Sequence, residues 1–297
     1  MAIGNYGELK TASENWLAGR TDQTARVPEW IKLAEDRIAQ DLRIRPMQNR
    51  ISIRVKATVD GVTVGGTANA ITLTPSIAAT SYATGDRYFF DAASNNTGAT
   101  AVDVSGLGTK NIKAQEGGIK RDPDADDIQA GARQDIHYDG TDFILIPPGG
   151  VSVPSRFIET RNLYLDGDDK KLDFFPEQDF WTRKAVNTTA RPEMFTIEGD
   201  FWVLAPTTDT TVTLVAFYWR RFATLSADSD TNWVIDNATG LLLYGTELEA
   251  MLFLHDDDGA LRYAQLYEDL LERVHKADRR GLFPAGQLVS RTEVPVI

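Results

Sequence analysis

The 297-residue chain has no cysteine and only three histidines. The absence of cysteine excludes disulfide scaffolds, thiolate metal sites, cysteine nucleophiles and thiol redox chemistry. The scarcity of histidine leaves few groups for general acid–base catalysis near neutral pH. Positive charge is also in short supply, because 31 Lys and Arg against 43 Asp and Glu give a formal net charge of −12. An acidic balance argues against a protein that reads nucleic-acid sequence, so composition favours a binding or structural part over an enzyme.

Long apolar runs are missing as well. The most apolar stretches, at 241–244 and 251–254, are far shorter than the ~20 residues that cross a bilayer. Residues 1–16 lack the basic start and continuous apolar core of a signal peptide. We therefore expect a soluble protein that is made in a cytoplasm. Its 42% hydrophobic and 25% charged residues are typical of a globular fold.

Helical patterns are present near both ends of the chain. Apolar residues recur every three or four positions at 9–16, 27–42, 241–251 and 263–277, a spacing that predicts amphipathic helices. Pro28 suits the first turn of the second helix, where its missing N–H has no partner. The polar break at 255–259 is short, so the last two helices should form an antiparallel hairpin.

The middle of the chain has a different composition. All six tryptophans lie outside residues 56–150, where Thr, Ala, Gly, Asn and Asp dominate. Alternation with period two predicts short strands at 71–74, 87–91, 101–104 and 143–146, separated by turn sequences such as those at 95–98 and 139–140. Further strands are expected within 153–173 and 194–218. Short strands at this spacing predict a small β-sandwich or barrel.

The order of these segments predicts an α+β fold with an insertion. Residues 1–54 and 151–281 should form one discontinuous domain, with N-terminal helices, a small β-sheet region and the C-terminal hairpin. Residues 55–150 should form an inserted all-β domain, and 282–297 an extended tail. Separate domains in series would leave the N-terminal helices without partners for their apolar faces.

The usual catalytic and metal-binding patterns are not found. No phosphate-binding loop and no nucleophile elbow occurs, and residues 106–111 lack the third glycine of a dinucleotide fingerprint. The aspartates at 122–127 and 228–232 lack the glycine and glutamate that a calcium loop needs. Paired carboxylates for glycoside cleavage give no specific signal among 43 acidic residues. His255 beside Asp256–Asp258 could ligate a metal, but aspartates between two helices are expected to cap the second one. His137 and His275 stand alone, so we expect no catalytic residue, no metal and no cofactor.

The helical segments resemble the head-to-tail adaptor proteins of tailed bacteriophages. The similarity lies in YGELKTA at 6–12, VPEWIKLAEDRI at 27–38, DLRIR at 41–45, VPSRFIETRNLYLDG at 153–167 and ADRR at 277–280. The middle resembles a small β-module of phage tail-fibre and baseplate proteins, through GTANAITLTP at 66–75, YATGDRYFF at 82–90 and YDGTDF at 138–143. The adaptor family is expected to carry only a short connection at that place.

The resemblance implies a structural virion protein of the phage neck. Such adaptors form a homo-oligomeric ring, commonly of twelve copies, beneath the portal protein. The ring extends the DNA channel and serves as a platform for tail, nozzle or fibre proteins. Genomic DNA would pass through the lumen without specific binding, and no membrane is involved.

Two sets of residues are candidates for contacts with partners. Closure of a ring needs two different faces on each subunit, and these are predicted to be the basic Arg37, Arg43 and Arg45 and the acidic Asp256, Asp257 and Asp258. In the family the C-terminal segment docks on the portal. The candidate docking residues are Leu282, Phe283, Leu288, Val289, Val294, Val296 and Ile297.

Two other functions remain open on the sequence. The chain is alternatively a tail-fibre, collar or receptor-binding component whose β-domain binds host glycans or other virion proteins. Tyr82, Tyr88 and Tyr138 would then be candidates for stacking on sugars, although core packing is the favoured role for each. A lysis enzyme that cleaves cell walls is the third possibility.

Overall fold

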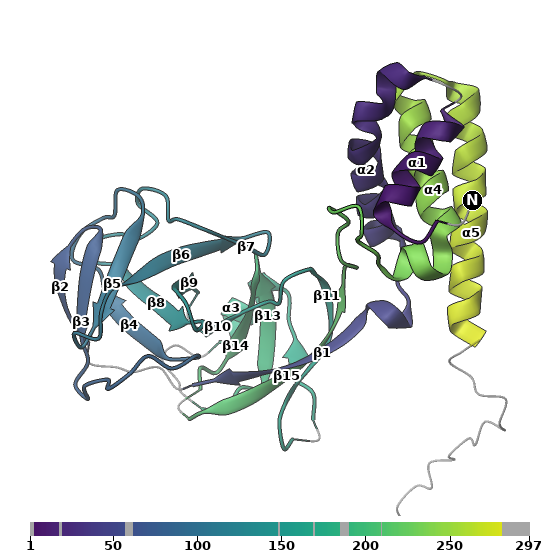
Figure 1. Cartoon of the computed structure of the whole chain (residues 1–297). Coiled ribbons are helices and arrows are strands. Elements are labelled where there is room, and N and C mark those ends of the chain that lie inside the picture. The colour runs from purple at the N-terminus through teal and green to yellow at the C-terminus, as the bar shows by residue number, and fades with distance from the viewer. Residues whose placement is uncertain are drawn as a thin grey trace, which may run out of the picture. The chain divides into compact units, whose positions relative to one another are not determined.

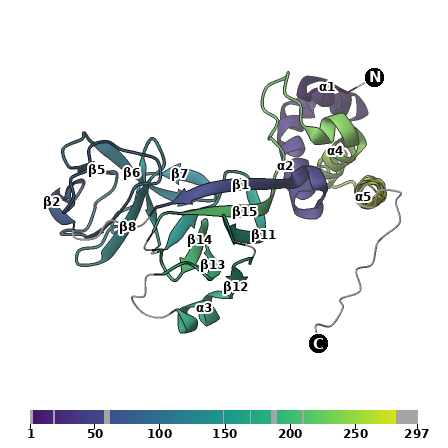
Figure 2. The same cartoon turned by 90° about the horizontal axis from the view of Figure 1, so that it is seen from below.

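The computed structural model describes residues 3–17, 20–56, 62–147, 149–168, 170–184, 190–208 and 210–280. The chain divides into two compact units, one formed by Met1–Gln48 with Arg220–Ile297 and the other by Asn49–Trp219. The first unit is helical and the second is built mainly of strands (Figures 1 and 2). The predicted α+β class is therefore confirmed.

Four helices pack side by side in the helical unit (Figure 1). They are α1 (Tyr6–Trp16), α2 (Val27–Asp41), α4 (Trp233–Phe253) and α5 (Asp257–Arg280), with short 3₁₀ turns η1 (Thr21–Arg26) and η2 (Arg45–Met47) beside α2. Helix α4 contacts each of the other three. All four predicted helices are present, and α4 and α5 are longer than the periodic segments that indicated them.

Local sequence explains where these helices begin and which faces they bury. Pro28 lies in the first turn of α2, as expected. Asn232 caps α4, because its side-chain oxygen accepts hydrogen bonds from the N–H groups of Val234 and Ile235 at 3.1 Å. Helix α5 buries little beyond Ala260 and Tyr267, so its other faces meet solvent. By contrast α4 is apolar over most of its circumference and occupies the centre of the unit.

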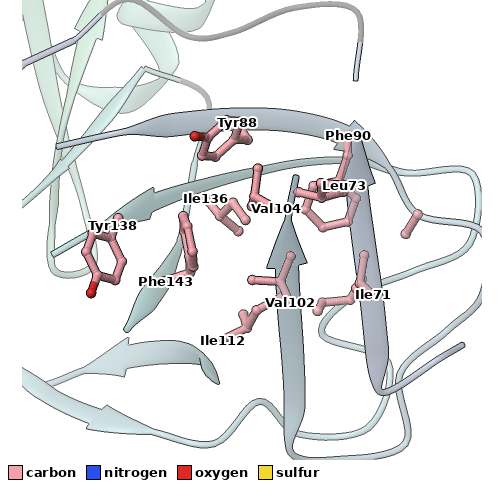
Figure 3. Packing of buried hydrophobic residues seen from close by; sticks show 12 residues of the cluster. Ile71, Leu73, Tyr88, Phe90, Val102, Val104, Ile112, Ile136, Tyr138 and Phe143 are labelled. Atoms are coloured by element: carbon pink, nitrogen blue, oxygen red, sulfur yellow. The ribbon is translucent and has the colours of Figure 1, made fainter. Parts of the chain in front are cut away.

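The strand-rich unit contains a curled sheet with its own core. Its strands are β2 (Thr63–Thr67), β3 (Ala70–Thr74), β4 (Arg87–Asp91), β5 (Thr100–Val104), β6 (Lys110–Glu116), β7 (Ile119–Arg121), β8 (Arg133–Tyr138) and β9 (Phe143–Ile146). The order in the sheet is β2-β3-β5-β6-β9-β8-β4, with β7 paired to β6, and the sheet is nearly closed into a barrel. Alternate side chains from its strands fill the interior, as Figure 3 shows.

A second β lobe in the same unit surrounds a separate core. A three-stranded sheet has the order β1-β15-β11, and a four-stranded sheet has the order β10-β14-β13-β12. The strands are β1 (Gln48–Val55), β10 (Gly150–Ser152), β11 (Phe157–Leu165), β12 (Asp173–Phe174), β13 (Met194–Glu198), β14 (Phe201–Ala205) and β15 (Val212–Arg220), and a short helix, α3 (Glu177–Arg183), packs on β13. The indole of Trp202 is fully buried in this core and donates a hydrogen bond to Thr160 Oγ1 at 2.6 Å.

The chain leaves the second lobe after β1 and returns to it at β10. Val55 of β1 and Val151 of β10 belong to the core of the second lobe, whereas strands β2–β9 surround the barrel core. Two separate cores therefore lie within one compact unit, and the domain boundaries near residues 55 and 150 stay a prediction. The compact units themselves divide at 48/49 and 219/220. Assignment of 1–54 with 151–281 to a single domain stays a prediction.

Phe143 offers a direct test of the barrel core. It is fully buried and its ring lies 5.1 to 6.0 Å from the rings of Tyr82, Tyr88 and Tyr138. We expect Phe143→Ala to lower the free energy of unfolding by about 3–5 kcal/mol, because it leaves a cavity among these rings. Urea unfolding followed by tyrosine fluorescence measures this loss.

The matched control removes the same side chain from the surface of the unit. Phe174 is 55% exposed, so Phe174→Ala should cost less than about 1 kcal/mol. Equal costs for the two variants would contradict the assigned core.

Candidate functional site

The predicted basic face consists of arginines that already have partners inside the helical unit. Arg37 of α2 donates through Nε and Nη2 to Glu249 Oε1 on α4, at 2.9 and 2.5 Å. Arg45 pairs with Asp278 of α5 at 3.0 Å, and its backbone N–H donates to the same carboxylate. These pairs hold α2 and the segment after it against the C-terminal hairpin.

Arg43 lies just after the C-terminal end of helix α2, which ends at Asp41. Its Nη1 donates to the carbonyl oxygens of Ala39 and Leu42 at 2.8 and 2.7 Å. Carbonyl groups at the end of a helix lack partners within the helix, so a cationic side chain stabilises them. Each of the three predicted arginines therefore has an internal structural role, and their contact with another subunit stays a prediction.

The predicted acidic face lies at the start of α5. Asp256 caps the helix, because its Oδ1 accepts a hydrogen bond from the N–H of Gly259 at 3.0 Å. Asp257 and Asp258 occupy the first turn, where negative charge complements the helix dipole. All three carboxylates are exposed. The structure thus brings them together at one accessible corner and does not bring them to the arginines.

The candidate portal-docking residues fall outside the described part of the chain. They are Leu282, Phe283, Leu288, Val289, Val294, Val296 and Ile297. Their role stays a prediction.

The tyrosines considered for sugar binding belong to the barrel core. Tyr88 and Tyr138 are 3% and 6% exposed, and their rings point into the barrel beside Phe143 (Figure 3). Tyr82 is partly buried; its hydroxyl donates to the carbonyl of Gly108 at 2.7 Å. Tyr88 and Tyr138 are therefore core residues, and the Tyr82 ring packs against Tyr138 and Phe143 with ring centres 5.3 and 5.5 Å apart.

No metal centre is assembled within the described ranges, where no group of three or more metal-ligating side chains comes together. In the acidic loop, Arg121 pairs with Asp124 and Asp127 at 3.0 and 3.3 Å, and Lys113 pairs with Asp122 at 2.6 Å. Also within these ranges, no helix has the length and apolar character to span a bilayer.

A buried carboxyl group inside the helical unit was not anticipated from the sequence. Glu247 of α4 is fully buried, and within the described part of the chain neither of its oxygens has a hydrogen-bond partner of good geometry. Burial raises the pKa of this carboxyl to about 7, and the Ser13 hydroxyl of α1 offsets that only in part. The available signal was a Glu among the apolar residues of this helix, and the expectation of a one-sided apolar face led away from it.

A second, partly buried carboxyl joins α2 to the segment before α4. Glu35 Oε1 accepts hydrogen bonds from the N–H of Leu225 at 3.2 Å and from Asn232 Nδ2 at 3.5 Å. Burial raises its pKa to about 7. The group therefore fastens a loop of the unit and its charge is costly there.

A buried ion pair lies on the outer side of the barrel. Arg87 Nη2 donates to Asp135 Oδ2 at 2.9 Å, and the two side chains are 5% and 0% exposed. Burial raises the pKa of Asp135 to about 6, against the lowering effect of Arg87. Burial likewise lowers the pKa of the neighbouring His137 to about 4. Both Arg87 and His137 line a cavity of about 290 Å³ whose other wall includes Val55 of β1.

A protein-family model described as SU10 adaptor protein matches residues 4–116 and 125–290. The chain therefore belongs to the SU10 adaptor protein family, which consists of bacteriophage structural proteins. No curated protein matches the chain.

The family match also tests what was expected of the β-rich middle of the chain. Most of residues 55–150 lie within the matched ranges, so the expectation of only a short family connection at this place is not supported. Similarity of the barrel to tail-fibre modules stays a prediction.

Glu247 predicts a pH dependence of the helical unit. Its pKa is about 7 in the folded chain against an ordinary 4.5. The stabilising neutral form is therefore fully present below pH 4.5 and lost as the pH rises through 7. Between pH 4 and 8 this group should remove about 3 kcal/mol from the free energy of unfolding. Glu247→Gln should abolish that part of the decline, as measured by urea unfolding across the pH range.

The control for Glu247→Gln is Glu268→Gln, which changes an exposed residue of α5. It should leave the pH profile as in the wild type. A Glu247→Gln variant that loses stability with pH as steeply as the wild type would refute the assignment.

The Arg87–Asp135 pair yields a double-mutant test. At pH 8, Arg87→Met should cost about 3–5 kcal/mol, because it removes the cationic partner of a buried carboxylate. The double variant Arg87→Met/Asp135→Leu should recover most of this loss, since no buried charge remains. Equilibrium unfolding measures both, and a double variant as unstable as the single one would contradict the prediction.

Proposed function

We propose that this chain forms the head-to-tail adaptor ring of a tailed bacteriophage, in many copies beneath the portal protein. The observation that carries the proposal is the match of the adaptor family model to most of the chain. The ring extends the channel through which DNA leaves the head and provides a platform for tail, nozzle or fibre proteins. Its place is the neck of the virion.

The charge of the chain supports a role as a DNA conduit. A net charge of −12 means that a ring of many copies is strongly acidic. An acidic lumen repels phosphates, whereas a basic lumen would retain them by releasing counterions. DNA would then pass without specific binding.

Ring closure requires contact between two different surfaces of neighbouring copies. The exposed corner formed by Asp256, Asp257 and Asp258 remains a candidate for one of them. Among the described residues, no cationic side chain lies within ion-pair distance of Asp257 or Asp258, so both carboxylates are available to another subunit. Arg37, Arg43 and Arg45 remain the candidates for the other surface.

The C-terminal tail is the proposed contact with the portal. Residues 282–297 combine apolar side chains with two prolines and have no helical periodicity. A free disordered terminus is usually more polar, so the composition favours a segment that is ordered by a partner. No specific observation supports the alternative glycan-binding role, because the candidate tyrosines pack in or against the barrel core.

A truncation after Arg280 tests the proposal. Because α5 ends at Arg280, the truncated protein should keep the helicity and unfolding midpoint of the full chain. It should fail to form rings when mixed with purified portal protein, whereas the full chain should form them. Negative-stain electron microscopy and native mass spectrometry of the mixtures measure both outcomes.

The control replaces residues 281–297 by a Gly/Ser segment of equal length. It keeps the length of the chain and removes its apolar side chains, so it should also fail to bind. Portal binding by either variant would overturn the docking role of the tail, and absence of rings with the full chain would overturn the adaptor function.

A further inference from the structure

One face of the three-stranded sheet carries aromatic side chains that the core does not use. Along β15, Ala216 and Tyr218 are buried in the core of the second lobe or against it. Because successive side chains of a strand point to opposite faces, Phe217 and Trp219 lie on the other side of the sheet. Both rings are only partly buried. The strand therefore presents an aromatic row away from its core.

Arginines from the two flanking strands cover this row. The guanidinium of Arg50 on β1 lies 5.7 Å from the centre of the Phe217 ring. That of Arg161 on β11 lies 5.2 Å from the Trp219 ring. Tyr164 of β11 meets Phe217 edge to face, with ring centres 5.8 Å apart. All three strands thus contribute to one surface, which we term the arginine–aromatic face (Arg50, Arg161, Tyr164, Phe217, Trp219).

The two arginines differ from those of the helical unit. Both are exposed, and among the described residues no carboxylate lies within 4 Å of either guanidinium. Arg37 and Arg45, by contrast, each have an acidic partner. A guanidinium stacked on a ring keeps its in-plane N–H groups free, and these match the two oxygens of a carboxylate or phosphate. The face is therefore prepared for an anionic partner.

The surroundings of the face favour carboxylates over a phosphate chain. It borders a hollow of about 470 Å³ that Asp166 and Asp168 also line. Asp168 is paired with Arg191 at 2.8 Å, but the exposed Asp166 repels a polymer with one negative charge per nucleotide. A protein surface, by contrast, can place single carboxylates against the arginines. Arg, Trp and Tyr are also the residues that dominate the centres of protein interfaces.

We propose that the arginine–aromatic face binds carboxylates of a second copy of this chain, as one side of the contact between neighbours in the ring. This inference rests on the proposed function. The occupant follows from charge complementarity, since a chain with 43 acidic and 31 basic residues presents mainly carboxylates to its neighbour. Contacts around a ring join two different surfaces, so a basic face on one copy meets an acidic face on the next.

The double charge reversal Arg50→Glu/Arg161→Glu tests the proposal. Rings of the full chain on purified portal protein are counted by electron microscopy and native mass spectrometry over a concentration series. The reversal should raise the concentration for half-complete rings by about tenfold or more, because like charges then face each other. Single copies should still bind the portal. Circular dichroism and the urea midpoint establish that the variant folds.

A milder variant and a matched control accompany the reversal. Arg50→Gln/Arg161→Gln removes the charge without placing carboxylates against the rings, so it decides the question if the reversal fails to fold; it should weaken assembly by a smaller factor. Arg156→Glu/Lys170→Glu makes the same change in net charge at two exposed positions of the same unit that do not line the hollow. It should assemble as the wild type does.

The outcomes separate this proposal from the adaptor function. If the wild type forms rings and both Arg50/Arg161 variants form them equally well, the proposed contact is wrong and the adaptor function stands. If the reversal leaves rings intact but abolishes retention of a labelled DNA oligonucleotide, the face binds nucleic acid and the proposal is likewise wrong. If the wild type itself forms no rings with the portal, the adaptor function is overturned, and the proposed contact between neighbours in the ring is overturned with it.

Discussion

The burial of helix α4 is the constraint on which the helical unit depends. The helix is apolar on most of its circumference, and it cannot remain in water without partners on several sides. Helices α1 and α2 from the start of the chain and α5 from its end supply these partners. Residues separated by about two hundred positions must therefore meet, and the chain between them forms a long excursion that starts and ends at this unit.

Within that excursion, two β cores are stabilised separately. The barrel closes around Phe143 and its neighbouring rings, and the second lobe closes around Trp202. The chain passes from one to the other only at β1 and β10, and the buried Arg87–Asp135 pair lies on the barrel beside this passage. Each lobe therefore has a hydrophobic core of its own.

The arginines of this protein have two different roles. Arg37 and Arg45 are used inside the helical unit, where they join elements that are distant in sequence. Arg50 and Arg161 lie on aromatic rings and remain open to solvent. The net charge supports the proposed conduit through which DNA passes freely. Only the positions of individual arginines show which of them form ion pairs inside the protein and which lie on a surface that can bind a partner.

The sequence by itself determined the elements. Periodicity and turn residues located α2, the barrel strands β3, β4, β5 and β9, and the helical hairpin, because local spacing decides which side chains share a face. The adaptor family was indicated separately, by the resemblance of the helical segments to phage adaptor proteins. Only the tertiary structure decided which charged groups have partners inside the protein and which remain open at its surface. Arg45 and Asp278 are 233 residues apart, and Glu247 is buried because helices from both ends of the chain enclose it. Contacts between residues so far apart in the sequence leave no local pattern. Only the folded structure therefore showed the internal partners of the predicted basic face and brought the arginine–aromatic face together.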